Sequence, residues 1–226
     1  MVATEMLDVA CSREAEFLER IRDIAFPCVG AKAAAARGNL AIVHARSLAS
    51  AWNDLEIHEK LLEWSASIKG SEELHSFAVV FEGPECLDEE TFEQLLWQRL
   101  QSLADKDAWK GQRYDKAVNA DVDHPHFSLS FGGEGFFVVG LHPNASRPAR
   151  RFSNPVLVFN LHRQFVRLRE EGRYGRMHER IMARDKALAG STNPMLADHG
   201  TASAARQYSG RIVSADWKCP FQDPRA

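Results

Sequence analysis

The sequence lacks any long hydrophobic run. No apolar stretch reaches the roughly 20 residues that a membrane-spanning helix needs. The first twenty residues, MVATEMLDVACSREAEFLER, carry acidic side chains where a signal peptide would carry an apolar segment. We therefore expect a cytoplasmic protein without a membrane partner.

Cysteine is scarce, and the common catalytic motifs are missing. The four cysteines are widely spaced and form no CxxC pair, so a structural zinc site has no local signature. In a reducing cytoplasm they are expected to be thiols. The sequence contains neither a GxGxxG nor a GxxxxGK[ST] phosphate loop, and no GxSxG elbow. These absences argue against the common nucleotide-binding folds and against a serine hydrolase.

An excess of positive charge is missing as well. The formal net charge is -3, which gives no overall reason to expect a nucleic-acid partner. The chain has 226 residues, 45% of them hydrophobic and 26% charged, which is typical of a globular protein with a sizeable core. The simplest interpretation is one domain over residues 1–226.

Hydrophobic periodicity predicts alternating helices and strands. Gly132-Gly133 separates two strand-like runs and predicts a tight hairpin, while Gly172 could interrupt the last long helix. Residues 106–126 are polar and aperiodic, which predicts a surface connection. The expected class is α+β, with a mixed sheet that has a central hairpin and is covered by helices. Helices are predicted over residues 14–25, 29–37, 47–68, 88–104 and 163–188, and strands over 40–44, 77–81, 127–131, 134–141 and 155–160.

Cys28 follows Phe26-Pro27 and lies at the start of an alanine-rich predicted helix. Backbone N–H groups and the helix dipole at such a position stabilise a thiolate, which suits a nucleophile or an iron ligand. The alternative interpretation is a packed helix–helix corner. Cys219 lies before Pro220 near the end of the chain, and proline there could leave its sulfur facing a pocket.

The segment LHPNASRPARRF, residues 141–152, follows a predicted strand and concentrates polar side chains. His142 could ligate iron through a neutral imidazole. Arg147, Arg150 and Arg151 could hold carboxylates with their guanidinium groups. The alternative is a solvated basic loop.

Further histidines and arginines carry weaker signals. His124 and His126 lie near acidic side chains, but no third metal ligand is predictable nearby. His178 falls within a periodic element and is expected at the core edge or the surface. Arginines spaced along the last long helix indicate a salt-bridged exposed face, with Arg167 and Glu171 as one pair, more than a nucleic-acid surface. They are Arg163, Arg167, Arg169, Arg173, Arg176, Arg180 and Arg184.

Several motifs together resemble the YqcI/YcgG family over residues 23–222. They are Phe26-Pro27-Cys28, the strand pair FSLSFGGEGFFVVGLHP, the loop ending Arg150-Arg151-Phe152, the strand PVLVFN, and WKCPF at 217–221. Leu141-His142-Pro143 and the run 205–208 (ARQY) look closest to the guanitoxin-type branch of haem-dependent N-hydroxylases. Related members include a haem protein that hydroxylates the guanidino nitrogen of arginine.

This resemblance implies a haem b cofactor whose iron activates dioxygen or peroxide and transfers oxygen to a guanidino or amine nitrogen of a small substrate. The iron ligand would be one of Cys28, Cys219 and His142, since each matches a family motif. Arg147, Arg150 and Arg151 would hold the haem propionates or a substrate carboxylate. A redox partner could supply electrons. The alternatives are a non-catalytic haem-binding or sensor protein and a haem-free small-molecule-binding domain.

Overall fold

A computed structural model describes residues 2–196 and 200–226, with side chains described from residue 12 onward. The helices are α1 (Val2–Arg22), α2 (Val29–Ala36), α3 (Asp54–Ser67), α4 (Glu89–Trp109), α5 (His162–Glu170), α6 (Tyr174–Ala189) and α7 (Ala205–Tyr208), with a 3-10 turn η1 (Pro148–Arg150). The strands are β1 (Leu40–Ser47), β2 (Ser76–Gly83), β3 (Leu129–Phe131), β4 (Glu134–Leu141) and β5 (Val156–Leu161).

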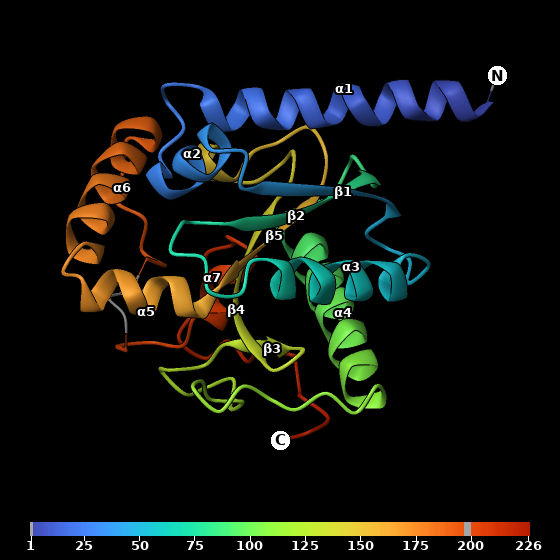
Figure 1. Ribbon diagram of the computed structural model, residues 1–226. Coiled ribbons are helices and arrows are strands. Elements are labelled where there is room, and N and C mark those ends of the chain that lie inside the picture. The colour runs from blue at the N-terminus through green and yellow to red at the C-terminus, as the bar shows by residue number, and fades with distance from the viewer. Residues whose placement is uncertain (1, 197–199) are drawn as a thin grey trace.

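The strands form one mixed sheet in the order β1-β2-β5-β4-β3. Strands β1 and β2 are parallel, whereas the pairs β2–β5, β5–β4 and β4–β3 are antiparallel. In the view of Figure 1, α1 and α2 lie above the sheet and α3 and α4 lie below it. The predicted α+β class with a mixed, helix-covered sheet is confirmed.

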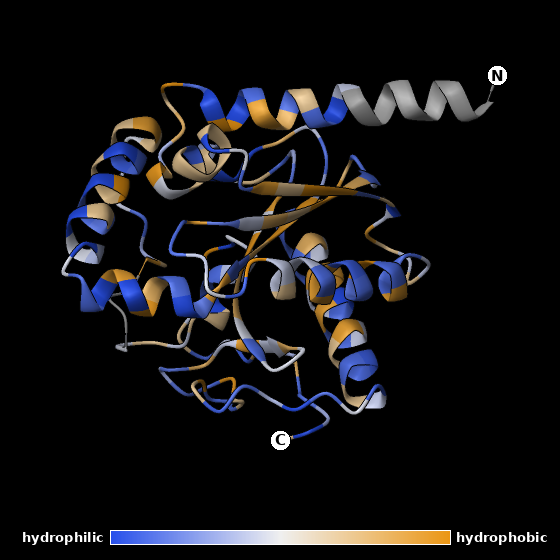
Figure 2. Ribbon diagram, in the orientation of Figure 1, coloured by the Kyte–Doolittle hydropathy of each residue, from blue (hydrophilic) through white to orange (hydrophobic). Residues whose placement is uncertain are grey.

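Side-chain alternation along the strands divides the core into two clusters. Phe77, Val79, Leu157 and Phe159 pack toward α3 and α4. Their neighbours along the same strands, which include Ala78 and Val156, pack toward α1 and α2. Figure 2 shows the strands as largely hydrophobic and the helices as mixed, so both faces of the sheet are buried.

The predicted hairpin forms at the side of the sheet, with β3 as its edge strand. Gly132 and Gly133 have φ values of +60° and +78°, which glycine adopts without steric cost. Further along β4, a Cβ atom at Gly140 would lie 2.7 Å from Phe92. Glycine at this position therefore allows α4 to pack closely on the sheet.

Helix boundaries differ from the predicted ones where side chains compete with the helix. The predicted helix over 47–68 begins only at Asp54, because Asn53 Oδ1 accepts a hydrogen bond from the Arg46 N–H group at 3.0 Å and stabilises a turn. Gly172, with φ +66°, separates α5 from α6 as the sequence indicated. The short helix α7 was not predicted. No helix in the described part of the chain is long and apolar enough to cross a membrane.

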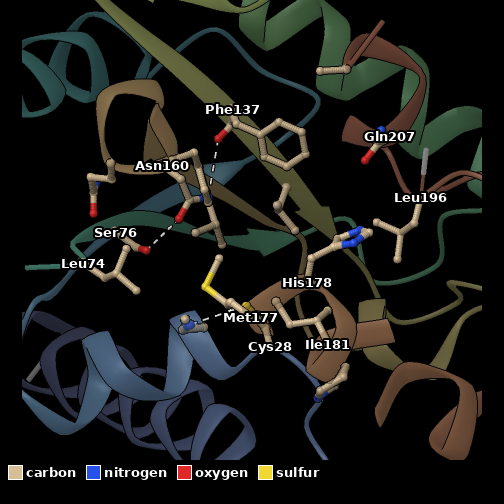
Figure 3. A pocket seen from close by; sticks show the side chains of 18 of the residues that line it. Cys28, Leu74, Ser76, Phe137, Asn160, Met177, His178, Ile181, Leu196 and Gln207 are labelled. Atoms are coloured by element: carbon tan, nitrogen blue, oxygen red, sulfur yellow. Dashed lines mark hydrogen bonds between the residues drawn. The ribbon is translucent and has the colours of Figure 1, made fainter. Parts of the chain in front are cut away.

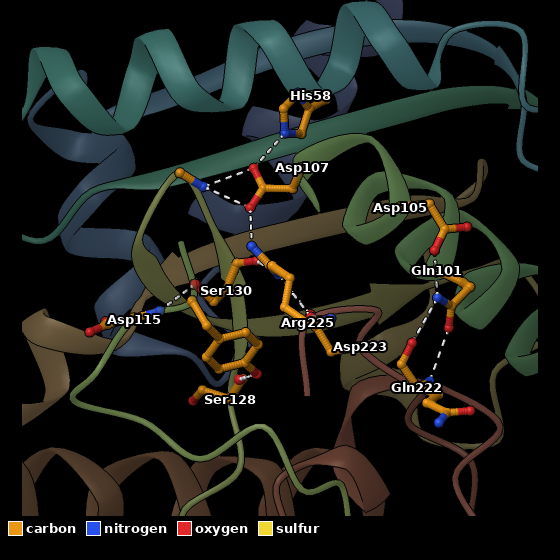
Figure 4. Close-up of polar contacts among 12 residues, drawn as sticks. His58, Gln101, Asp105, Asp107, Asp115, Ser128, Ser130, Gln222, Asp223 and Arg225 are labelled. Atoms are coloured by element: carbon orange, nitrogen blue, oxygen red, sulfur yellow. Dashed lines mark hydrogen bonds and ion pairs between the residues drawn. The ribbon is translucent and has the colours of Figure 1, made fainter. Parts of the chain in front are cut away.

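A buried polar network attaches the C-terminal segment to the core (Figure 4). Asp107 on α4 lies 2.6 Å from His58 Nε2 and accepts the Gly132 N–H bond at 2.9 Å. Arg225 donates to Asp107 at 2.5 Å and to the Ser130 carbonyl oxygen at 2.8 Å. Because His58 and Asp107 are both 0% exposed, these contacts are made away from water. The network joins α3, α4, the hairpin and the C-terminal segment.

We predict that Asp107→Ala lowers the free energy of unfolding by about 3–5 kcal/mol, because it leaves the buried His58 imidazole without its partner and removes one of the two carboxylates that Arg225 contacts. Chemical denaturation measures this change. Lys110→Ala is the matched control, since Lys110 and Glu59 form an ion pair in which Glu59 is largely exposed. It should cost about 1 kcal/mol or less. Equal effects of the two substitutions would contradict the role given to Asp107.

Candidate functional site

A cavity of about 300 Å³ lies between the sheet and helices α2, α5 and α6. We call it the Cys28 cavity. Much of its wall is apolar, including Phe137 and Val158 on the strands and Met177 and Ile181 on α6. Figure 3 shows Cys28, Asn160, His178 and Gln207 among the side chains around it. Its volume and its combination of an apolar wall with inward polar groups are typical of a small-molecule site.

Cys28 is the N-cap of α2, as the sequence indicated. Its sulfur accepts a hydrogen bond from the Ala31 N–H group at 3.4 Å. Burial raises the pKa of the Cys28 thiol above its ordinary value, although the Ala31 and Gly30 N–H groups and the charge of Arg150 act in the opposite direction. The prediction of a low-pKa thiolate is therefore wrong for the protein without a bound metal, because desolvation outweighs the helix terminus.

The three candidate arginines of the loop that follows β4 have intramolecular partners. Arg147 is buried and pairs with Asp185 on α6. Arg150 donates to the carbonyl oxygens of Gly140 and Gln207, each at 3.0 Å. Burial lowers the pKa of Arg150 to about 10. Arg147 and Arg150 line the Cys28 cavity.

Arg151 lies apart from the cavity. It is exposed, and it donates to the carbonyl oxygens of Ala145 at 2.7 Å and Ser146 at 3.0 Å. It borders a separate, open hollow beside α1, together with Arg20 and Pro148. The basic loop thus divides, with two arginines facing the cavity and one facing outward.

His142 and Cys219 do not line the Cys28 cavity. His142 is 1% exposed and stacks on Phe92 of α4 with ring centroids 4.3 Å apart, on the other face of the sheet. Burial lowers its pKa. Cys219 packs with Trp217 against the α3–α4 cluster, and burial raises its pKa to about 12. The three candidate iron ligands therefore do not meet in one site.

Several polar residues of the cavity were not among the sequence candidates. Asn160 on β5 faces the cavity, where its Oδ1 accepts the Ser76 hydroxyl at 2.7 Å. His178 was expected at the core edge or surface but also lines the cavity, as does Gln207. A polar residue at an inward position of an apolar strand was the available signal for Asn160. No local sequence signal distinguishes His178, because the packing of α6 against the rest of the protein determines what its side chain faces.

Charge in the cavity is predominantly positive. Among the described residues that line it, Asp185 carries the only carboxylate, whereas Arg147, Arg150 and Arg169 carry guanidinium groups. Four lining histidines add further nitrogen donors or acceptors, namely His75, His126, His162 and His178. Within the described residues, no group of three His, Cys, Asp or Glu side chains could hold a bare metal ion. The charge of the cavity therefore favours an anionic ligand.

We predict that Cys28 reacts with iodoacetamide more slowly than Cys86 by about tenfold or more, because only the thiolate is the nucleophile and burial disfavours it. Cys86 is exposed and serves as the internal reference. Peptide mass spectrometry over time measures both rates, and the Cys28 rate should still rise above about pH 8.5, the pKa of a free cysteine. Faster labelling of Cys28 than of Cys86 would show that its thiolate is stabilised after all.

Comparison with known proteins identifies the family. No curated protein and no solved structure matches the chain significantly. A family model described as the YqcI/YcgG family matches residues 17–222, which include every strand and the Cys28 cavity. Because this match covers most of the sequence, the chain belongs to the YqcI/YcgG family.

Proposed function

We propose that the chain is a haem-dependent oxygenase that hydroxylates a guanidino or amine nitrogen of a small substrate. The Cys28 cavity would supply the iron ligand and part of the wall around the haem and the substrate. Family membership and the motif resemblance to the guanitoxin-type branch support this proposal. The structural observation that carries it is a cysteine sulfur, held by a backbone N–H group, at the wall of a largely apolar cavity.

The residues of the cavity fit a haem with one thiolate ligand. Such a cofactor needs a protein ligand to its iron and apolar surfaces around its ring, and Cys28 with the walls around it supplies both. The Ala31 N–H group would continue to donate to the sulfur and so orient it. When bound, haem with a thiolate ligand supplies activation of dioxygen or peroxide for oxygen transfer.

Ligation would also change the protonation of Cys28. Burial keeps the thiol neutral in the protein alone, but a coordinating thiol loses its proton to bind a metal. The charge of Arg150 and the two backbone N–H groups near the sulfur favour that anion. Haem binding through Cys28 should therefore release a proton. Cys219 and His142 remain the alternative ligands that the family motifs suggest.

Substrate handling would fall to the remaining polar groups of the cavity. Ser76 holds the Asn160 side chain through a 2.7 Å hydrogen bond, which orients the amide of Asn160. His178 lies at the cavity wall (Figure 3), where a neutral imidazole can accept a proton from a substrate nitrogen. With dioxygen, the conversion of N–H to N–OH needs two electrons and two protons and also yields water. A redox partner would supply the electrons; hydrogen peroxide would need none.

We predict that protein produced with haem supply has a Soret band, and that Cys28→Ser shifts or abolishes it. Visible absorption spectroscopy measures the effect. Cys86→Ser should leave the band unchanged, because Cys86 is exposed and does not line the cavity. Cys219→Ser and His142→Ala should also leave its position unchanged. A folded wild-type protein without a Soret band would exclude haem, and a change only in Cys219→Ser or His142→Ala would move the ligand to that residue.

We predict that the haem-loaded protein converts at least one compound from a panel of arginine and other guanidino compounds or amines to its N-hydroxylated product. The reaction should require either dioxygen with a reductant or peroxide. Mass spectrometry detects the addition of one oxygen atom, and Cys28→Ser should abolish product formation. Haem binding without product across the panel would favour a non-catalytic haem-binding or sensor protein.

A haem-free small-molecule-binding protein is the second candidate. It is favoured by the engagement of Arg147 with Asp185 and of Arg150 with backbone carbonyl oxygens, since propionates would have to compete for both. The raised pKa of Cys28 agrees with a neutral thiol in an apolar wall. The spectrum of the wild-type protein separates this candidate from the first.

A further inference from the structure

Arg169 lines the Cys28 cavity and differs from Arg163, Arg167 and Arg173 of the arginine-rich region around α5 and α6. Arg163 pairs with Glu134 at 3.2 Å. Arg167 pairs with Glu171 at 3.5 Å, which confirms the predicted pair, and Arg173 pairs with Glu171 at 2.8 Å. The Arg169 side chain forms no ion pair or hydrogen bond with any residue that the structure describes. A cation without a carboxylate partner thus remains beside the cavity.

Arg169 is half-buried and lines the Cys28 cavity, contrary to the exposed face expected for these arginines. Its Cζ atom lies 4.8 Å from the centroid of the Tyr174 ring. Tyr174 in turn stacks with His178 at 5.8 Å, and both rings line the cavity. The Nε atom of Arg169 is buried and has no hydrogen-bond partner in the described structure. Tyr174 therefore positions the guanidinium group, and no described residue accepts a hydrogen bond from it.

Other cations of the cavity are compensated. Asp185 is used by Arg147, and Arg150 is held by backbone carbonyl oxygens. A partly desolvated guanidinium group without an acceptor is unfavourable, and a carboxylate satisfies it with charge-assisted, often paired, hydrogen bonds. An anionic ligand at Arg169 would therefore supply the hydrogen-bond acceptor and the negative charge that the protein itself does not provide.

We propose that Arg169, positioned by the Tyr174 ring on which His178 also stacks, forms a subsite for the carboxylate group of a small organic acid. If the proposed function holds, this acid is the substrate, and the inference rests on that function for the ligand's identity. Like charges repel, so a cationic nitrogen on the same molecule would lie away from Arg169. The subsite thus fixes the direction in which an amino acid enters the cavity.

Benzoate and benzamide form a matched pair of probes, since they share a ring for the apolar wall and differ mainly in charge. Isothermal titration of the protein as purified should show benzoate binding at least about tenfold more tightly than benzamide. Arg169→Met should remove this preference while leaving benzamide binding unchanged, and Arg169→Lys should retain part of it. Arg173→Met is the control, because Arg173 is exposed and does not line the cavity. It should keep the full preference.

Equal binding of the two probes by the wild type, no binding of benzoate, or a preference that survives Arg169→Met would each overturn the subsite. Unchanged benzamide binding by Arg169→Met shows that the variant folds with its cavity intact. The visible spectrum tests the proposed function separately. A protein without a Soret band that still prefers benzoate through Arg169 would reject the haem proposal and keep the subsite. A haem-loaded protein that does not prefer benzoate would reject the subsite and keep the haem proposal.

Discussion

The two-residue alternation of side chains along β2, β5 and β4 is the constraint on which the site depends. Alternate residues of these strands, such as Phe77 and Phe159, point to one face of the sheet and pack in the buried core beneath α3 and α4. The intervening residues include Ser76 and Asn160, which face the cavity. A shift by one residue in any strand would exchange the two sets. This alternation also places His142 beside Phe92 of α4, on the face of the sheet opposite the Cys28 cavity.

Desolvation then sets the chemistry inside the cavity. It raises the pKa of the Cys28 thiol and lowers that of Arg150, so it disfavours charge on both groups. Arg147 keeps a partner in Asp185, and Arg150 keeps backbone acceptors. The protein has therefore compensated for its most deeply placed cations with its own groups. Arg169, near the junction of α5 and α6, lacks such compensation, so a ligand would have to neutralise its charge.

Local signals in the sequence were sufficient for most elements but for only part of the site. Gly132-Gly133 marked the hairpin turn and Gly172 marked the end of α5, because a positive φ is a local property. The N-cap position of Cys28 was equally local. The pKa of its thiol and the exposure of Arg169 were not, since each depends on which distant segments cover the residue. The sequence identified Cys28, Cys219 and His142 as candidate iron ligands, but it could not show that only Cys28 lies at the cavity while the other two pack on the opposite face of the sheet.

The edge of β4 connects the stability of the sheet to the cavity. Because β3 pairs only with residues 134–136, the remainder of β4 has no strand partner on that side. Arg150 covers part of this remainder, because it donates to the Gly140 carbonyl oxygen, and it also donates to the Gln207 carbonyl oxygen of α7. Arg150 also lines the cavity and lies close enough to Cys28 to affect its pKa. A ligand that drew Arg150 toward itself would therefore expose the β4 edge and loosen α7, so the sheet favours ligands that leave this arginine in place.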